Sequence, residues 1–268
     1  AVHDHEHGDW MRRSLSHVVS LQEPNGYFGE RDDSRMYGHG IMTLMLAEAL
    51  GMVGDPVVEE QIREALERAV RITEHAARVK KKDVHRGGWR YQPHDKDSDL
   101  SLSGWQLMSL HACQQVGIEV SEEVVRDACR YAKRLTSKDG SVGYNKPGDD
   151  HPALRGLSLL SLAIVGEEDD ELADAVSRRM QEDPFRWRGP WMFYRVYYDA
   201  VGLSRARPEQ WQDYHHLIED ELVAQQRDDG SWPTPPGDNE GRFGVVYRTS
   251  MCVLALAVER YVLPAYQR

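Results

Sequence analysis

Apolar and charged positions along the chain form helical segments of two kinds. In the first kind, apolar residues recur three and four positions apart and charged residues fill the opposite face, as in residues 56–79, 121–135 and 167–180. Segments of the second kind are apolar on several sides: residues 36–52, 100–117, 152–166, 191–203 and 245–262. Alternation of apolar and polar residues, which is typical of strands, never continues beyond a few positions. The pattern therefore predicts an all-α protein.

Turns rich in glycine and aromatic residues separate the two kinds of helix. They recur at residues 21–30, 85–91, 137–145, 184–191 and 225–233. We therefore expect about five helical hairpins, each with one amphipathic and one apolar helix. In a double ring of helices, the inner helices are covered on all sides, which explains the apolar segments. The outer helices keep one solvent-exposed face, which explains the amphipathic segments. This arrangement is an α/α toroid, closed or nearly closed.

The predicted toroid occupies residues 10–268 as a single domain, and residues 1–9 are expected to form a flexible N-terminal segment. With 268 residues, of which 40% are hydrophobic and 29% charged, the chain has the composition of a soluble globular protein. The formal net charge of −11 argues against a nucleic-acid partner. No run approaches the roughly 20 apolar residues of a membrane span. The compartment stays open: cytoplasmic, or exported with a signal removed.

Two acids, Asp97 and Asp99, lie just before the apolar segment that begins at Leu100. Burial beside another carboxylate raises the pKa of a carboxyl group, so this pair could supply a proton donor in an apolar cavity. Both acids reach one site only if the backbone before the helix is not helical. The alternative is that they are plain helix caps in a solvated loop. The sequence leaves both interpretations open.

Aromatic side chains lie at or near the beginnings of the apolar segments and in the turns, where they would line the mouth of a cavity. The candidates for ligand binding are Trp89, Tyr91, Trp105, Tyr144, Trp191, Tyr194 and Tyr247. Aromatic faces bury apolar ligands and stabilise cations. His39 is a further candidate, because Gly38 and Gly40 beside it allow close approach of a ligand or of a neighbouring helix.

Arginine residues supply the remaining candidates. Arg155 could bind an anionic group such as a diphosphate or carboxylate, although pairing with the acids of the chain itself is the simpler interpretation. Arg195 and Arg248 fall within apolar segments, where an unpaired charge is costly. We therefore expect carboxylate partners for both. The three cysteines, Cys113, Cys129 and Cys252, are interpreted as packing residues.

Two of the glycine–aromatic turns carry a specific motif. Residues 22–28 and 226–232 match the Q-x-x-x-G-x-W/F repeat of squalene and oxidosqualene cyclases, residues 136–142 form a degenerate copy, and Gly87-x-Trp89 keeps part of it. The chain therefore resembles the terpene cyclase and protein prenyltransferase β-subunit superfamily, whose members share an α/α toroid. The resemblance covers nearly the whole chain as architecture.

The resemblance also implies a catalytic acid. Triterpene cyclases that act by protonation carry D-x-D-D-T at the start of an inner helix, and its middle aspartate is the acid. Asp99 matches that acid and Asp97 matches its upstream neighbour, while Leu100 stands where a further aspartate is expected.

A zinc site is the other property that the superfamily implies. Prenyltransferase β subunits bind zinc through D-x-C and a later histidine. Asp99 fits the aspartate, but Ser101 replaces the cysteine and Arg155 lies near the histidine position. His151 could act instead only with a shifted alignment. We therefore expect no metal or other cofactor, with zinc at Asp99 and His151 as the less favoured alternative.

The expected function is that of a terpene-cyclase-like or prenyltransferase-like protein. It would bind or act on an isoprenoid or other apolar molecule in the central cavity of the toroid, with Asp99 as the candidate acid. Two alternatives stay open: a non-catalytic toroid that binds a protein partner, and an enzyme that acts on a polysaccharide.

Overall fold

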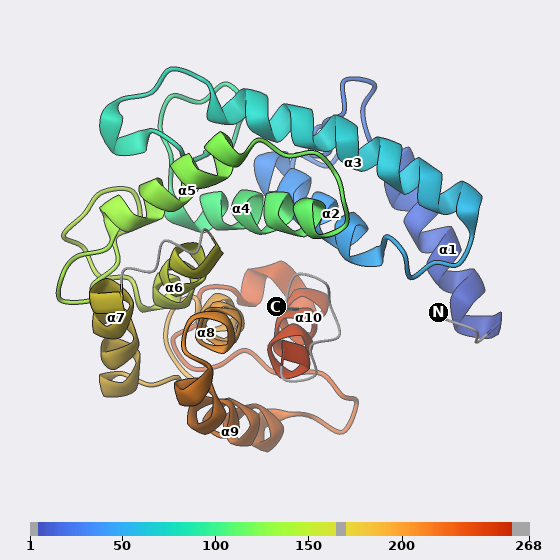
Figure 1. Ribbon diagram of the computed structural model, residues 1–268. Helices are drawn as coiled ribbons and strands as arrows, with labels where there is room; N and C mark the ends of the chain where they lie inside the picture. The colour runs from blue at the N-terminus through green and yellow to red at the C-terminus, as the bar shows by residue number, and fades with distance from the viewer. Residues whose placement is uncertain (1–4, 165–169, 259–268) are drawn as a thin grey trace. The chain divides into compact units, whose positions relative to one another are not determined.

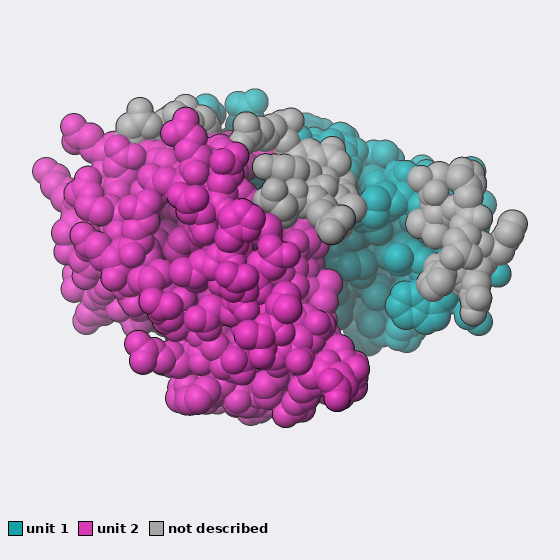
Figure 2. All heavy atoms as spheres, turned by 90° about the horizontal axis from the view of Figure 1, so that it is seen from below, with its two compact units in different colours: residues 1–131 teal, residues 132–268 magenta. Residues whose placement is uncertain are grey.

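The structure is a computed structural model in which residues 5–164 and 170–258 are described. Its regular secondary structure in this part is entirely helical, with two isolated bridges and no strand. The chain divides into two compact units, Ala1–Tyr131 and Ala132–Arg268 (Figure 2). The all-α prediction is confirmed. None of the described helices combines the length and the hydropathy that a membrane crossing requires.

The first unit contains two apolar helices and the amphipathic helices around them (Figure 1). Its elements are α1 (His5–Ser20), α2 (Arg35–Ala49), α3 (Pro56–Ala77), the 3-10 turn η1 (Asp83–His85), α4 (Leu100–Gln115) and most of α5 (Glu122–Leu135). α2 packs along α4, and α3 contacts α1, α2 and α4. Every residue of α4 from Leu100 to Cys113 is buried, as predicted for an inner helix.

The second unit repeats this pattern with three apolar helices. Its elements are η2 (Pro152–Leu154), α6 (Arg155–Ile164), α7 (Asp170–Glu182), α8 (Met192–Ala206), α9 (Pro208–Gln225), η3 (Gly241–Phe243) and α10 (Gly244–Ala257). α8 packs against α6 on one side and α10 on another, while α7 and α9 cover α6 and α8. Gly156 and Gly202 allow the close crossing of α6 and α8, because a Cβ on either would meet backbone atoms within 2.1 Å.

Three of the glycine turns pack closely against the next amphipathic helix along the chain. Gly26, Gly87 and Gly140 all have positive φ, and a Cβ on any of them would lie 2.1–2.7 Å from a backbone carbonyl oxygen of α3, α5 or α7, respectively. Gln22 strengthens the first turn by donating to the carbonyls of Gly26 and Ala65. The recurring glycine therefore serves close packing between turn and helix as well as backbone conformation.

Candidate functional site

Asp99 is the N-cap of α4 and is fully buried. Its Oδ1 accepts hydrogen bonds from the backbone N–H of Leu102 at 2.8 Å and from the Ser101 hydroxyl at 2.7 Å. Its Oδ2 accepts from the Arg90 guanidinium at 2.6 Å. The capping interpretation is confirmed, but the cap lies in the protein interior and not in a solvated loop.

Asp97 shares the same arginine. Its side chain is 55% exposed, and its Oδ2 lies 3.5 Å from Nε of Arg90. One guanidinium thus balances both carboxylates, an arrangement that orients Asp97 and Asp99 and holds the 89–99 linker in place. The described contacts of Asp99 are those of a structural carboxylate, and its role as an acid stays a prediction.

The aromatic candidates near Asp99 lie mostly in the core. Trp89 and Trp105 are 1% and 4% exposed, and the indole N–H of Trp89 donates to the Thr73 carbonyl at 2.8 Å. Tyr91 is half-buried and packs on the Arg90 guanidinium, 4.3 Å from its ring centroid. These contacts assign packing roles to the two tryptophans.

His39 is buried and joins three segments of the first unit. Its Nδ1 accepts the backbone N–H of Phe28 at 3.2 Å, and its Nε2 lies 3.2 Å from the Ala69 carbonyl and 3.1 Å from the Thr73 hydroxyl. Burial lowers the pKa of His39 to about 4, so the ring is neutral at physiological pH. Of the two interpretations of its flanking glycines, close helix packing fits: a Cβ on Gly40 would lie 2.5 Å from the Gln106 side chain.

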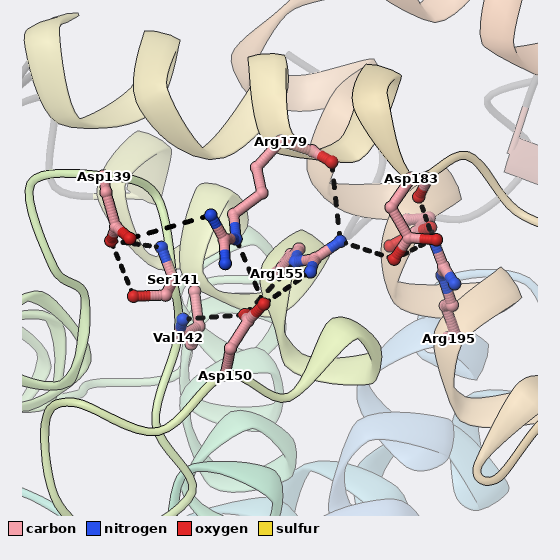
Figure 3. A network of polar contacts seen from close by, with 9 residues as sticks. Asp139, Ser141, Val142, Asp150, Arg155, Arg179, Asp183 and Arg195 are labelled. Carbon is pink, nitrogen blue, oxygen red and sulfur yellow. Dashed lines mark hydrogen bonds and ion pairs between the residues drawn. The ribbon is translucent and has the colours of Figure 1, made fainter.

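Arg155 lies in a network of ion pairs in the second unit. Figure 3 shows its guanidinium between Asp150 and Asp183. The two ion pairs measure 2.7 Å and 2.9 Å, and only 4% of the Arg155 side chain is exposed. Arg179 also contacts Asp150, at 3.0 Å. Although partial burial opposes ionisation, hydrogen bonds from the two arginines lower the pKa of Asp150. The simpler prediction for Arg155, pairing with acids of the chain itself, is confirmed.

The same network continues to α8 and α9. Arg195 lies 3.5 Å from Asp183 and 3.4 Å from the fully buried Asp199, so its predicted carboxylate partners are confirmed. Burial raises the pKa of Asp199 to about 6, an effect that the charge of Arg195 partly offsets. The Tyr214 hydroxyl donates to Asp199 at 2.9 Å. Arg248 differs from the prediction, since its guanidinium donates hydrogen bonds to two backbone carbonyls, those of Trp232 and Gly241.

Tyr144 and His151 lie next to each other in the loop before α6, with ring centroids 6.0 Å apart. His151 belongs to the second unit and Asp99 to the first. In the described part of the chain, the group of potential metal ligands that lies close together is a different one: His215, His216 and Glu219 on the surface of α9.

Trp191, Tyr194 and Tyr247 lie with two further aromatic residues, Phe193 and Phe243, at the starts of α8 and α10, where the rings form two groups of contacts. The ring of Tyr194 lies 6.3 Å from that of Trp191, and the ring of Tyr247 lies 6.3 Å from Phe193 and 5.2 Å from Phe243. Trp191 and Phe243 are 38% and 48% exposed. We call these five residues the aromatic cluster.

Trp191 has a strained backbone. Its φ of 57° and ψ of 36° place a bulky residue in the left-handed region at the N-cap of α8. Its N–H donates to the Asn239 side chain at 3.0 Å, which fixes this conformation. Backbone strain of this kind persists only where the surroundings enforce it, and it is concentrated at functional sites.

Glu240 lies behind the aromatic cluster and was not identified from the sequence. It is fully buried; Oε2 accepts the Phe193 N–H at 2.8 Å and Oε1 accepts the Tyr247 hydroxyl. Burial raises its pKa to about 7, against the effect of these hydrogen bonds. In the sequence, Glu240 follows Asp238 and Asn239 in a polar linker, where nothing distinguishes it from a surface acid.

A surface pocket of about 450 Å³ occurs elsewhere, between the end of α3, the following loop and the start of α5. Its lining includes Arg78, Lys80, Lys81 and Arg86 together with Asp83, Glu123 and Asp127. Burial lowers the pKa of Lys81 to about 8. None of the residues predicted to bind a ligand lines this pocket.

Comparison with known proteins identifies the fold. No protein-family profile and no curated protein sequence matches the chain. Among solved structures, the type II terpene cyclase MstE from Scytonema matches 92% of this chain and 72% of its own, with 15% identity and a TM-score of 0.60. A variant of MstE in complex with its product, merosterolic acid A, matches 92% of this chain and 74% of its own, with 15% identity and a TM-score of 0.57. The chain has the α/α toroid fold of these cyclases, as predicted.

Proposed function

We propose that this protein binds an isoprenoid or a similarly apolar small molecule. The observation that carries the proposal is the fold, which matches a type II terpene cyclase over 92% of the chain and also matches that cyclase with its product bound. A fold alone does not determine function, so the local chemistry has to agree. It does so at the aromatic cluster, where partly exposed rings offer apolar surface to a ligand.

Binding is proposed here in preference to acid-initiated cyclisation at Asp99. Protonating an alkene requires a carboxyl group that holds its proton in an apolar surrounding. Asp99 instead caps α4 and pairs with Arg90 at 2.6 Å. Cyclisation therefore forms the narrower version of the proposal, and it requires Asp99 to leave this pairing when a ligand binds.

A thermal-shift screen tests the proposal. Isoprenoid alcohols and diphosphates form the first set, and oligosaccharides and divalent metal ions form the comparison sets. A ligand at about 100 times its dissociation constant stabilises the folded state by roughly 2.7 kcal/mol. For a chain of this size, that corresponds to a rise in Tm of a few degrees.

We expect the rise with isoprenoids and not with oligosaccharides. A rise with oligosaccharides alone would replace the proposal with the polysaccharide alternative. Where an isoprenoid binds, analysis of the products in the presence of wild type and Asp99→Asn separates binding from cyclisation. Conversion by wild type that Asp99→Asn abolishes, while the variant stays folded by circular dichroism and still binds the isoprenoid, would establish Asp99 as the acid.

A further inference from the structure

The aromatic cluster combines two large exposed rings, Trp191 and Phe243, with a strained backbone position at Trp191. Trp89 and Trp105 are almost completely buried, whereas Trp191 and Phe243 expose more than a third of their surface. Large exposed rings at the end of an apolar helix are costly to leave in water, and they suit a ligand that covers them. The strain at Trp191 adds independent evidence, because it holds the ring at the surface.

The segment that contains Asn239 and Glu240 joins the two halves of the cluster. Asn239 accepts the N–H of Trp191 at 3.0 Å, and Glu240 accepts the N–H of Phe193 at 2.8 Å. Glu240 also accepts the Tyr247 hydroxyl from α10. One short segment thus positions the first residues of α8 and the polar group of Tyr247 together.

We infer that the aromatic cluster is the binding site for the oxygen-bearing end of an isoprenoid, with Tyr247 as the hydrogen-bonding group and Glu240 as the residue that sets its direction. This inference rests on the proposed function and gives it a location. Trp191, Tyr194 and Phe243 cover the apolar part of the ligand. Tyr247 is half-buried and contacts both Phe193 and Phe243, so its hydroxyl supplies a polar contact among apolar rings.

The protonation state of Glu240 determines whether the Tyr247 hydroxyl donates a hydrogen bond to a ligand or accepts one from it. When Glu240 is ionised, it accepts a hydrogen bond from the Tyr247 hydroxyl, and the oxygen of Tyr247 can accept a hydrogen bond from a ligand hydroxyl. When Glu240 is protonated, it donates to Tyr247, and the Tyr247 hydroxyl hydrogen is free for a ligand oxygen. Because burial raises the pKa of Glu240 to about 7, both states are populated near neutral pH.

Within the described part of the chain, Asp238, Tyr198, Cys252 and Arg248 are the other ionisable groups that act on this pair or on its neighbours. Asp238 opposes the ionisation of Glu240, and Tyr198 and Asp238 oppose that of Tyr247. Burial raises the pKa of Cys252, which lies near Glu240 and Arg248, so the thiol stays protonated. Glu240 is therefore the group in this set that changes charge between pH 6 and pH 8.

Calorimetric titration with farnesol and with its methyl ether tests the inference. The ether can only accept a hydrogen bond, so it requires protonated Glu240. We expect the dissociation constant of the ether to rise about tenfold between pH 6 and pH 8, because the fraction of protein with protonated Glu240 falls about tenfold. Farnesol, which can donate or accept, should change by less than about threefold over the same range. Glu240→Gln should bind the ether with no pH dependence, because the glutamine amide donates to Tyr247 at every pH.

Two further variants and a control locate the site. Trp191→Ala should weaken both ligands at least about tenfold, and Tyr247→Phe should abolish the pH dependence while the ring is retained. Trp10→Ala is the matched control, since Trp10 lies on α1 with 61% of its surface exposed. Circular dichroism establishes that each variant is folded. If farnesol binds wild type and Trp191→Ala equally, the inferred site is wrong and the proposed function survives. If farnesol does not bind wild type, both are wrong.

Discussion

Single residues show how one side chain type can serve different purposes according to its partners. Asp99, Asp199 and Glu240 are all fully buried acids. Asp99 caps α4 and pairs with Arg90, whereas Asp199 accepts a hydrogen bond from Tyr214 and lies 3.4 Å from Arg195. Glu240 accepts hydrogen bonds from neutral donors, the Phe193 N–H and the Tyr247 hydroxyl. Burial accordingly raises the pKa values of Asp199 and Glu240, and these two acids change charge near neutral pH.

The pairing of Asp99 with Arg90 predicts an effect on stability. Asp99→Asn keeps a side chain that can cap α4 but removes the charge opposite Arg90, so we expect the free energy of unfolding to fall by about 2 kcal/mol. Asp97→Asn is the matched control: this side chain is 55% exposed, and its replacement should cost less than about 0.5 kcal/mol. Urea unfolding followed by circular dichroism measures both. Equal effects of the two substitutions would mean that the buried pair contributes no more than the exposed one.

Glu240 predicts a pH dependence of stability. Its pKa is about 7 in the folded protein against 4.5 in the unfolded chain, so the folded state binds the proton more tightly. The free energy of unfolding should therefore fall as the pH rises from about 4.5 to about 7, by an amount on the order of 3 kcal/mol from this residue. Glu240→Gln should remove that part of the slope. Unfolding free energies of the two proteins at pH 5 and pH 8 provide the comparison, and parallel curves would contradict the assignment.

At the scale of elements, the hydrophobic pattern predicted most of the fold. Apolar segments became the largely buried helices α2, α4, α6 and α8, and the charged ones became α3, α5 and α7. α10 was also predicted to be covered on all sides, but Val245, Val246 and Val253 are 45%, 76% and 51% exposed. The glycine turns were also found in the sequence, because positive φ and close packing both require glycine. Glu240 and the cluster around it could not be found in this way, since burial of a linker acid depends on contacts between residues far apart in the sequence.

The packing of glycine turns against the following helix predicts a contrast between two glycines. Gly87 and Gly117 both have positive φ, but a Cβ on Gly87 would lie 2.1 Å from the Asp127 carbonyl oxygen, whereas nothing described lies within 4 Å of one on Gly117. Gly117→Ala should cost about 1 kcal/mol for backbone strain alone. Gly87→Ala adds a clash with the backbone of α5 and should cost at least about 2 kcal/mol more. Similar melting temperatures for the two variants would show that the turn does not need this contact.

For the whole molecule, the single domain at residues 10–268 stays a prediction, and the chain divides by compactness into two units. Each unit holds apolar helices covered by amphipathic ones, and the residues that form the aromatic cluster all belong to the second unit. All residues of the candidate ligand site therefore lie in the second unit.

Photo-crosslinking with a farnesol analogue that carries a diazirine tests the central claim most directly. We expect adducts that excess farnesol prevents, in peptides that contain Trp191 to Tyr194 or Phe243 to Tyr247, because these peptides carry the five residues of the aromatic cluster. The pocket beside Lys81 serves as an internal comparison, since its polar and charged lining should not retain an isoprenoid. Adducts in the peptides that line this pocket, or labelling that excess farnesol does not reduce, would contradict isoprenoid binding at the aromatic cluster.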